Sequence, residues 1–463
     1  TQQEDIKADK AMSYSLSEPI VAQITPSGTA AIAVIRISGK DCIPLVAKHF
    51  SQADKLIQAP GNSILHGYFL DEEGEPIDEV LLYVFRAPKS YTGDDTVELS
   101  CHGNPRLAAR ILKTLLLSAR MAKPGEFTLR ALHNGKLDLI QAEAVNDLIN
   151  APTRKSEAAA LSQLQGGLSD TINELLEQII NLRMRCELGI DFADQDLPPI
   201  DEQALAQDLA SLHHRLQQMI ASAAHGRLIR EGFRICLAGA PNSGKSSLFN
   251  AFLKQNRAIV TPHPGTTRDY LEESISLEGY WVILFDTAGL RESTDLIEKE
   301  GIRLSKQLMS EADLVLYLID ASTYEDLPEL ESPDKTLIVL SKADLVDKAR
   351  LQELKDKIPH DAAAASVMEE GGLDELYATI LSRLEHNKED GDTPLVTNTR
   401  HLAALQVCAG SLGKAQAALK QQLGFEFVAF DLIAASAALE EIIGLVSPDD
   451  LLNRIFSNFC IGK

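Results

Sequence analysis

The chain has 463 residues, a formal net charge of −23 and a sequence pI near 4.9. This length exceeds what one hydrophobic core usually serves, so two to four domains are expected. A protein that binds RNA by itself usually has an excess of basic residues, which this acidic chain lacks. Any nucleic-acid contact must therefore use a local patch or a partner protein. No apolar run approaches the ~18 residues of a membrane span and no signal-peptide core occurs, which predicts a cytoplasmic chain without membrane contact.

The first part of the sequence predicts a leader followed by a compact α+β domain. Residues 1–17 are polar and unpatterned, as in a disordered leader. Between residues 18 and 133, the segments Ala31–Ile37 and Val80–Phe85 are predicted strands, and Pro105–Ser118 is a predicted helix with leucines at helical spacing. We therefore expect an N-terminal α+β domain over 18–133.

Helix dominates the next stretch of the sequence and returns near its end. Residues 134–230 carry apolar positions at i, i+3 and i+4 almost continuously, and residues 389–463 show the same pattern, with helices over 402–419 and 428–445. Strands and helices alternate over 231–388. The simplest interpretation is one helical domain with a nucleotide-binding domain inserted in it, because domain termini often lie close together. The predicted fold class is multidomain α/β.

The inserted segment opens with a phosphate-binding motif. Gly239–Ser246 fits G-x-x-x-x-G-K-[ST] and lies between a predicted strand, Phe233–Ala238, and a predicted helix, Ser247–Leu253, which is the order the motif requires. Glycines let the backbone wrap a phosphate chain, while N–H groups and the helix N-terminus supply positive potential. Lys245 would reach the outer phosphates and the Ser246 hydroxyl would ligate magnesium. A glycine-rich turn before a helix is the minor alternative, because three further nucleotide motifs follow in order.

Two of these motifs would complete the magnesium and γ-phosphate contacts. Asp286–Gly289 follows the apolar strand Trp281–Phe285. Asp286 would hold magnesium through water, and the N–H of Gly289 would meet the γ-phosphate. Gly265–Asp269 lies between the phosphate loop and that strand, and a threonine there would complete the magnesium shell when triphosphate is bound.

The next motif indicates guanine as the base. Ser341–Asp344 follows the strand Thr336–Leu340 and occupies the place of the motif N-K-x-D. Asp344 would accept two guanine N–H groups that adenine cannot offer, and Lys342 would pack its stem along the base. Ser341 stands where Asn is usual, which puts one supporting hydrogen bond in question.

The segment Ser366–Met368 indicates a last base-contacting loop. The nucleotide-binding motifs, in this order along the chain, predict a GTPase and make ATP a much less favoured nucleotide. Ras-type GTPases carry Gln after the glycine of D-x-x-G to orient the attacking water, but this chain has Leu290. Either hydrolysis is slow, or a carboxylate from the acidic stretch Arg291–Glu298 positions the water. From the residues alone, a solvated acidic face is the favoured interpretation of that stretch.

The final residues predict a short helix followed by a tail with a thiol. Ser447 suits an N-cap, Pro448 suits the first helical position, and the helix should end near Phe459. Cys460 then lies on the tail, where prenylation is excluded because Gly462 is not aliphatic. Two interpretations remain: an incidental thiol, which chemistry alone favours, and a reactive thiol delivered to a shared site.

The sequence resembles the MnmE (TrmE) tRNA modification GTPase family across nearly its whole length. The resemblance is carried by the block Pro124–Leu139, the tail Phe459–Lys463, and the segments Pro264–Asp269 and Asp286–Glu292. Other GTPases share neither the block Pro124–Leu139 nor the tail Phe459–Lys463. The resemblance implies an N-terminal folate-binding domain over 18–133 that also forms a homodimer, a helical domain, and an inserted Ras-like P-loop GTPase domain over 231–388.

The resemblance also implies a function. Such proteins hydrolyse GTP with Mg²⁺, and K⁺-dependent pairing of their GTPase domains activates hydrolysis. With a FAD-dependent MnmG-type partner, in a heterotetramer or larger assembly, they add a carboxymethylaminomethyl or aminomethyl group to C5 of the wobble uridine of certain tRNAs. The implied one-carbon source is 5-formyl-tetrahydrofolate or a related reduced folate.

Residue roles follow from the same resemblance. The implied GTP-binding residues are Asn242, Ser243, Gly244, Lys245, Ser246, Ser247, Thr261, Thr266, Thr267, Asp286, Gly289, Ser341, Lys342, Asp344 and Ser366. The implied magnesium ligands are Ser246, Thr267 and Asp286, and the potassium ligands are Asn242, Val260, Thr261 and Thr266. The implied catalytic residues are Lys245, Cys460 and Glu298. Glu298 would orient the attacking water, which reverses the preference drawn from the residues alone.

The implied folate-binding residues are Arg36, Glu98, Lys136 and Lys463. Their types suit the ligand, because a carboxylate can accept the N–H groups of a pterin and cations can hold its glutamyl tail. Two other functions stay open: a ribosome-associated regulatory GTPase switch without modification chemistry, and a folate-dependent methyltransferase with an appended GTPase. A pure switch would not need Cys460 with the folate residues, and the methyltransferase would act without a flavoprotein.

Overall fold

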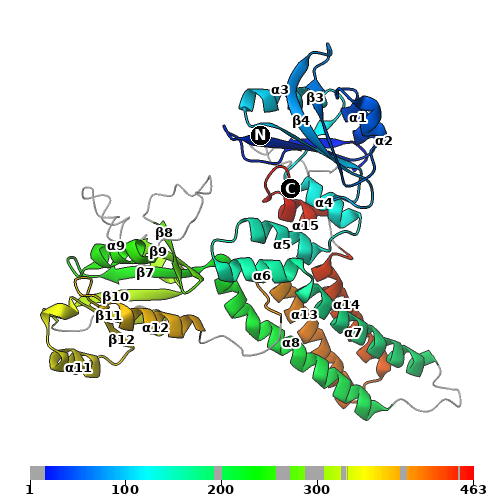
Figure 1. Cartoon of the computed structure of the whole chain (residues 1–463). Coiled ribbons are helices and arrows are strands. Elements are labelled where there is room, and N and C mark those ends of the chain that lie inside the picture. Colours follow the sequence, from blue (N-terminus) through cyan, green and yellow to red (C-terminus); the bar gives the residue numbers. More distant parts are fainter. Residues whose placement is uncertain are drawn as a thin grey trace, which may run out of the picture. The chain divides into compact units, whose positions relative to one another are not determined.

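The structure, a computed structural model, falls into two compact units, each with its own six-stranded sheet (Figure 1). Unit 1 combines Thr1–Asn146 with Glu440–Lys463, and unit 2 is Asp147–Leu439. The residues described are 16–191, 201–256, 272–286, 307–324, 330, 332–385, 394–446 and 449–463. Among these residues, no helix has both the length and the hydrophobicity needed to cross a bilayer.

Unit 1 is built on a sheet with the strand order β3-β4-β5-β2-β1-β6. All neighbouring pairs are antiparallel except β1 and β6. The strands are β1 (Ile20–Gln23), β2 (Ile32–Ser38), β3 (Ser63–Leu70), β4 (Pro76–Phe85), β5 (Thr96–His102) and β6 (Arg120–Met121). The strands expected over 31–37 and 80–85 are confirmed as β2 and β4.

Helices cover the two faces of this sheet unequally. One face packs against α1 (Cys42–Ala47), α2 (Ala53–Gln58) and α3 (Pro105–Leu115). Asn104 caps α3 by accepting the N–H of Arg106, and the helix ends earlier than the expected Ser118. The other face meets α4 (Glu126–His133), whose Phe127 packs against β1.

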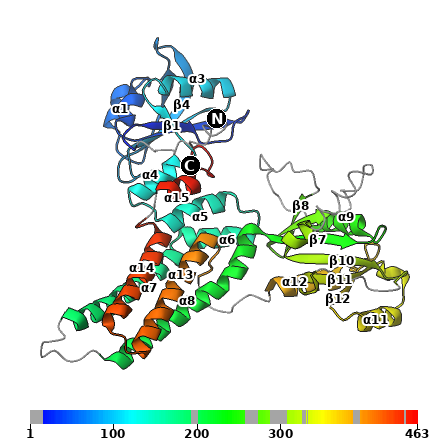
Figure 2. The ribbon, with the colours of Figure 1, turned by 180° about the vertical axis from the view of Figure 1, so that it is seen from behind.

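The end of the chain returns to unit 1 as α15 (Asp449–Phe456), which lies beside α4 in Figures 1 and 2. Phe456 and Phe459 pack against Leu129 and Ala142. Gly125, at φ 66°, precedes α4, and a Cβ there would come within 2.8 Å of the Phe456 ring. The expected helix is confirmed, although it stops at Phe456 and its predicted cap at residues 447–448 lies outside the described residues.

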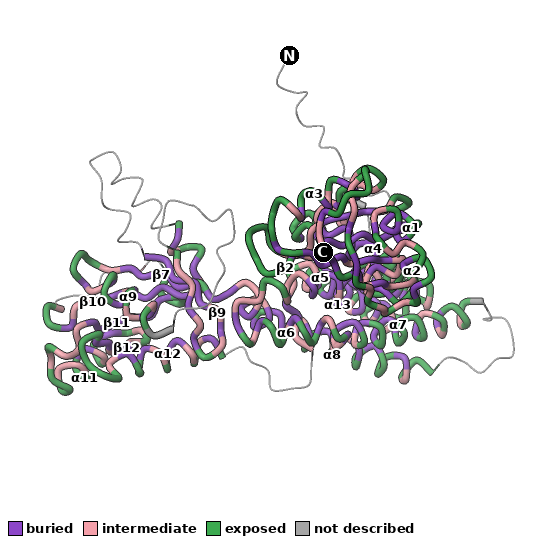
Figure 3. Tube along the Cα trace, turned by 45° about the horizontal axis from the view of Figure 1, so that its top comes forward, coloured by how far each residue is buried: buried purple, intermediate pink, exposed green. Residues whose placement is uncertain are grey.

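Unit 2 contains a bundle of long helices. Helix α5 (Leu139–Ile149) leads from unit 1 into it, and the helices that follow are α6 (Arg154–Leu164), α7 (Gly167–Asp191), α8 (Glu202–Glu231), α13 (Thr399–Lys420) and α14 (Phe425–Ile443). Helices α7, α8, α13 and α14 run side by side (Figure 2). Buried and exposed residues alternate along these helices (Figure 3), and the buried residues of α8 include Leu205, Leu209, Leu212 and Leu216 at helical spacing. The helical character expected over 134–230, 402–419 and 428–445 is confirmed for the described residues, although α14 ends at Ile443 and residues 192–200 lie outside them.

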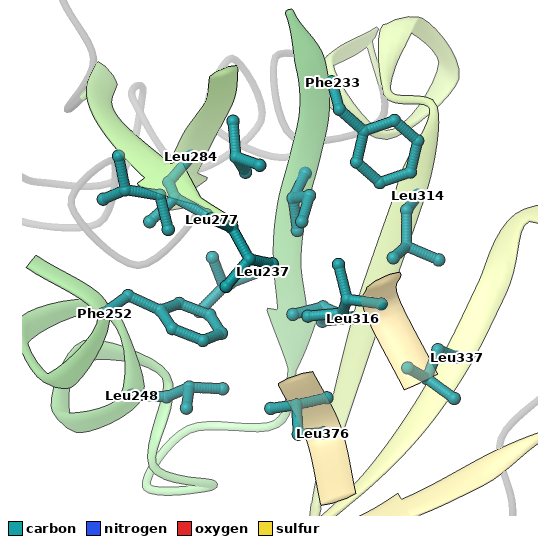
Figure 4. Packing of buried hydrophobic residues seen from close by; sticks show 14 of the residues in the cluster. Phe233, Leu237, Leu248, Phe252, Leu277, Leu284, Leu314, Leu316, Leu337 and Leu376 are labelled. Atoms are coloured by element: carbon teal, nitrogen blue, oxygen red, sulfur yellow. The ribbon is translucent and has the colours of Figure 1, made fainter. Parts of the chain in front are cut away.

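The second sheet of the chain also lies in unit 2, with the order β12-β11-β10-β7-β9-β8. Only β8 is antiparallel to its neighbour. The strands are β7 (Phe233–Gly239), β8 (Glu272–Leu277), β9 (Tyr280–Asp286), β10 (Leu314–Asp320), β11 (Thr336–Ser341) and β12 (Ala362–Ala364). One face packs against α9 (Lys245–Asn256) and α12 (Asp374–Glu385), and the other against α11 (Lys348–Lys357). Figure 4 shows Phe252 of α9 and Leu376 of α12 in the core with Leu237 and Leu316.

Two glycines inside helices of unit 2 offer a matched test of this packing. A Cβ at Gly226 on α8 would overlap the carbonyl oxygen of Val396, whereas a Cβ at Gly410 on α13 would meet open space. Helix propensity alone would make Gly→Ala stabilising by up to ~1 kcal/mol at either site. We expect Gly226→Ala to lower stability by about 1–3 kcal/mol through overpacking, and Gly410→Ala to raise it slightly. Thermal unfolding of the two variants measures the difference, and shifts of the same sign would contradict this packing.

Candidate functional site

The loop between β7 and α9 has the backbone of a phosphate-binding loop. Gly239, Asn242 and Gly244 have φ of 138°, 62° and 93°. A Cβ at Gly239 would overlap the carbonyl oxygen of Leu318, so the loop can lie this close to β10 only with glycine there. Helix α9 begins at Lys245, so its N-terminal N–H groups border the loop.

The side chains proposed for phosphate and magnesium lie together at this loop. Lys245 is buried, and its Nζ donates to the carbonyl oxygens of Gly239 at 3.0 Å and Ala240 at 2.7 Å. The Ser246 hydroxyl donates to the Asp286 carboxylate at 3.4 Å, and Asp286 is buried at the end of β9. A hydroxyl beside a carboxylate is the donor set that magnesium takes in nucleotide sites.

The other residues of the loop leave polar groups facing a ligand. The Ser243 hydroxyl is buried and makes no hydrogen bond within the described part of the chain, so a phosphate oxygen would satisfy it. Asn242 and Ser247 are exposed on the loop and the first turn of α9. Six predicted site residues lie outside the described residues: Val260, Thr261, Thr266, Thr267, Gly289 and Glu298.

The predicted base-binding residues Ser341, Lys342 and Asp344 line a cavity of about 370 Å³ next to the phosphate loop. The Asp344 carboxylate, in the short 3₁₀ turn Ala343–Leu345, accepts a 2.6 Å hydrogen bond from the buried Ser366 hydroxyl. The N–H of Ser366 donates in turn to the Gly372 carbonyl at 2.8 Å. Ser366 therefore fixes the orientation of the Asp344 carboxylate at the cavity wall.

Lys342 is held at the cavity wall by an ion pair. Its φ is 53°, a left-handed conformation that turns the chain after β11. Its Nζ lies 2.6 Å from Oδ2 of Asp320, at the end of β10. Burial would raise the pKa of Asp320, but the hydrogen bonds from Lys342 and Ser322 together outweigh it, so the pKa lies below its usual range. The aliphatic stem of Lys342 is thereby fixed along the cavity.

A second cluster of charged and aromatic side chains lies in unit 1, on the sheet face that α1, α2 and α3 do not cover. Arg36 on β2 is the cross-strand partner of Glu98 on β5, and its Nε and Nη2 lie 2.8 and 2.7 Å from the Glu98 Oε1. Cζ of Arg36 lies 5.1 Å from the ring centroid of Tyr91 and 5.4 Å from that of Phe127. The guanidinium is therefore held by a carboxylate and two rings.

The tail of the chain joins this cluster. Nη1 of Arg36 donates to the Gly462 carbonyl at 3.5 Å, and Nζ of Lys463 lies 5.8 Å from the Tyr91 ring centroid. Burial and the nearby charge of Arg36 lower the pKa of Lys463, against the opposing effect of Glu98. Gly462 has φ of 103°, and a Cβ there would crowd the backbone that follows β1.

Two other predicted site residues, Cys460 and Lys136, also lie in unit 1. Cys460 is exposed, and its carbonyl accepts the N–H of Lys463 at 3.3 Å and of Gly125 at 3.5 Å, so the backbone around the thiol is fixed. Lys136 does not join the Arg36 cluster within the described part of the chain, and its Nζ instead donates to the Pro88 carbonyl at 3.2 Å.

Sequence reasoning missed the two rings of the cluster. Phe127 lies inside the block Pro124–Leu139, so that block could have identified it as a residue of the site. Tyr91 has no local signal, because its position depends on how the loop between β4 and β5 folds. Its hydroxyl hydrogen-bonds with the Thr128 hydroxyl at 2.8 Å, which fixes the ring, and burial raises its pKa.

The phosphate-binding and base-binding loops of unit 2 follow the carboxyl ends of β7, β9, β11 and β12, and so meet at one edge of a mostly parallel sheet. Together with a carboxylate that faces a base-sized cavity, this arrangement defines the sheet domain as a P-loop GTPase domain.

Comparisons with known proteins give the family. A family model described as the MnmE helical domain matches residues 139–460, and one described as the GTP-binding protein TrmE N-terminus matches 19–136. The tRNA modification GTPase MnmE of Aquifex aeolicus is 41% identical over 457 residues, which cover 97% of this chain and 100% of that protein. The MnmE of Moorella thermoacetica is 42% identical over 465 residues, with the same coverage. The chain belongs to the MnmE family and is a tRNA modification GTPase.

Solved structures are also similar to part of this chain. The G domain of the T. maritima FeoB iron transporter is 28% identical, and the match covers 32% of this chain and 97% of that one with a TM-score of 0.24.

Proposed function

We propose that the chain is the GTP-hydrolysing subunit of a cytoplasmic complex that adds a carboxymethylaminomethyl or aminomethyl group to C5 of the wobble uridine of certain tRNAs. A FAD-dependent MnmG-type partner and a reduced folate complete the reaction. The observation that carries this proposal is the cluster of Arg36, Glu98 and Lys463 in unit 1. A GTPase that acted only as a switch would have no use for such a site.

In the proposed GTPase reaction, Lys245 neutralises the outer phosphates, and its contacts with the loop carbonyls keep the ammonium inside the loop. Ser246, Asp286 and Thr267 are the proposed magnesium ligands, and the ion would supply positive charge at the β/γ bridge. Glu298 orients the attacking water, because Leu290 has no polar atom for that role.

Potassium is the proposed activating ion for hydrolysis. Asn242, Val260, Thr261 and Thr266 are its proposed ligands once two GTPase domains pair. A monovalent cation beside the transferred phosphate supplies charge that an arginine finger gives in other GTPases. The exposure of Asn242 on the phosphate loop supports this role, because its amide oxygen can reach an ion there.

The Arg36 cluster fits a reduced folate such as 5-formyl-tetrahydrofolate, which would supply the one-carbon unit. The Glu98 carboxylate suits the pterin N–H groups, and Arg36 and Lys463 suit the glutamyl carboxylates. The rings of Tyr91 and Phe127 offer flat apolar surfaces beside these charges. Lys136 is a further proposed contact for the glutamyl tail, and the exposed Cys460 is the proposed reactive group.

A homodimer through unit 1 is supported by apolar side chains on the same open sheet face. Ile32, Ile64, Tyr68 and Leu81 are 56%, 62%, 47% and 38% exposed. Strand pairing places them on the face that carries Arg36 and Glu98. An apolar patch of this kind marks a protein interface, and a second copy of unit 1 is the proposed occupant.

The tRNA function is tested in cells that lack this protein. We expect mass spectrometry of tRNA nucleosides to show loss of the C5 group from the wobble uridine. Wild-type protein should restore it, whereas Lys245→Ala should fail through lost phosphate binding and Cys460→Ser through loss of the thiol. Unchanged tRNA in the deletion strain would exclude the modification role, and rescue by Cys460→Ser would exclude a catalytic thiol.

The folate site is tested by Glu98→Gln. We expect affinity for 5-formyl-tetrahydrofolate to fall roughly 10- to 100-fold, because a hydrogen bond to a charged group contributes about 1.5–3 kcal/mol. Isothermal titration calorimetry measures it, and Glu73→Gln, in the exposed turn between β3 and β4, is the control with no expected change. Equal affinity of wild type and Glu98→Gln would show that the ligand binds elsewhere.

The potassium site is tested by GTP turnover in KCl and NaCl at equal ionic strength. We expect faster turnover in KCl, and Asn242→Ala should reduce the KCl rate to the NaCl rate by removing an ion ligand. Asn250→Ala, exposed on α9, is the control that should keep the difference between the salts. Equal wild-type rates in both salts would rule out the assignment of the cation.

A further inference from the structure

The Ser341 hydroxyl is engaged with the protein backbone. Ser341 ends β11 and is 6% exposed. Its Oγ donates to the carbonyl oxygen of Ser243 in the phosphate loop at 2.7 Å and to that of Ile319 on β10 at 3.0 Å. A serine hydroxyl has a single hydrogen, so these two carbonyls share it. Ser341 therefore links β11 to the phosphate loop and keeps no hydrogen for a ligand.

An asparagine at this position, the usual residue in N-K-x-D, has a different donor count. Its amide carries two N–H donors, so it can bind a loop carbonyl with one and a base acceptor with the other. Ser341 lines the base cavity as that asparagine would, but its hydrogen is used within the protein. The substitution thus keeps the link to the phosphate loop and removes one donor from the cavity.

Among the described residues that line the cavity, no neighbouring side chain replaces that donor. The Lys342 ammonium is paired with Asp320, and Asp344 is an acceptor. Most of the remaining lining is apolar: Leu248, Leu318, Leu345, Ala365, Val367 and Met368. Ser247, the other hydroxyl of the lining, is on the first turn of α9 beside the phosphate loop.

We infer that this protein selects guanine at the edge bearing N1 and N2, through Asp344, and that none of the described side chains lining the cavity donates to the N7 acceptor on the opposite edge. Guanine offers N–H donors on the first edge and the acceptors N7 and O6 on the second. Ser341 is then a positioning residue that couples β11 to the phosphate loop. The site accepts guanine nucleotides that lack the N7 acceptor, a ligand class that an asparagine at 341 would select against.

Affinities of the full chain for GDP and 7-deaza-GDP test the inference, by competition against a fluorescent guanine nucleotide. In 7-deaza-GDP a C–H replaces N7, so only a donor aimed at N7 is affected. We expect the wild type to bind the two nucleotides within about twofold. We expect Ser341→Asn to bind GDP about 2- to 12-fold more tightly than 7-deaza-GDP, the range of one hydrogen bond.

Two further measurements separate recognition of the base by Asp344 from the positioning role of Ser341. Ser341→Ala should weaken both nucleotides equally, because it breaks the link to the phosphate loop without changing any contact to N7. Inosine diphosphate, which lacks the N2 amino group, should bind the wild type at least tenfold more weakly than GDP, since Asp344 loses a partner. A wild-type preference for GDP over 7-deaza-GDP above fivefold would overturn the inference, and this comparison needs no variant to fold. An unchanged ratio in Ser341→Asn would exclude position 341 as the source of selectivity.

Discussion

The packing of α15 onto α4 is the contact on which the organisation of the whole chain depends. Phe456 and Phe459 are almost completely buried, and burial of side chains of this size contributes about 1.5–3 kcal/mol each. The contact needs a glycine at position 125, because any side chain there would displace the Phe456 ring. It brings the last segment of the sequence back to unit 1, which makes unit 2 an insertion between two parts of unit 1. It also places Gly462 and Lys463 beside Arg36.

A different constraint organises the nucleotide site. Parallel strands align their carboxyl ends, so segments far apart in the sequence form a single edge of the sheet. The close approach of Gly239 to β10 and the hydrogen bonds of Ser341 hold the phosphate loop against that edge. The geometry of the strands, more than the loops themselves, therefore sets the spacing between the phosphate and base subsites.

Much of this could be predicted from the sequence, and the limits have physical causes. The phosphate loop and the strands and helices around it follow from local patterns, because glycine positions and hydrophobic periodicity are local demands. The grouping of Arg36 with Glu98 came only through family resemblance, since it depends on the register between β2 and β5. The positions of Tyr91 and Lys136 depend on how a loop packs in the folded protein, and such packing produces no periodic pattern in the sequence. The hydrogen bonds of Ser341 likewise cannot be read from its motif, where only the missing asparagine is visible.

The return of the chain to unit 1 also sets the order in which the protein can be completed during synthesis. The surface of α4 and α5 that receives Phe456, including Leu129 and Ala142, is made long before its partner. Synthesis of residues 147–439 takes about 15–60 s at ~5–20 residues per second. Throughout that interval a nascent chain carries an uncovered apolar surface and an Arg36 site without its tail. Unit 1 therefore stays incomplete until the last residues leave the ribosome, although its sheet is the first of the two to be translated.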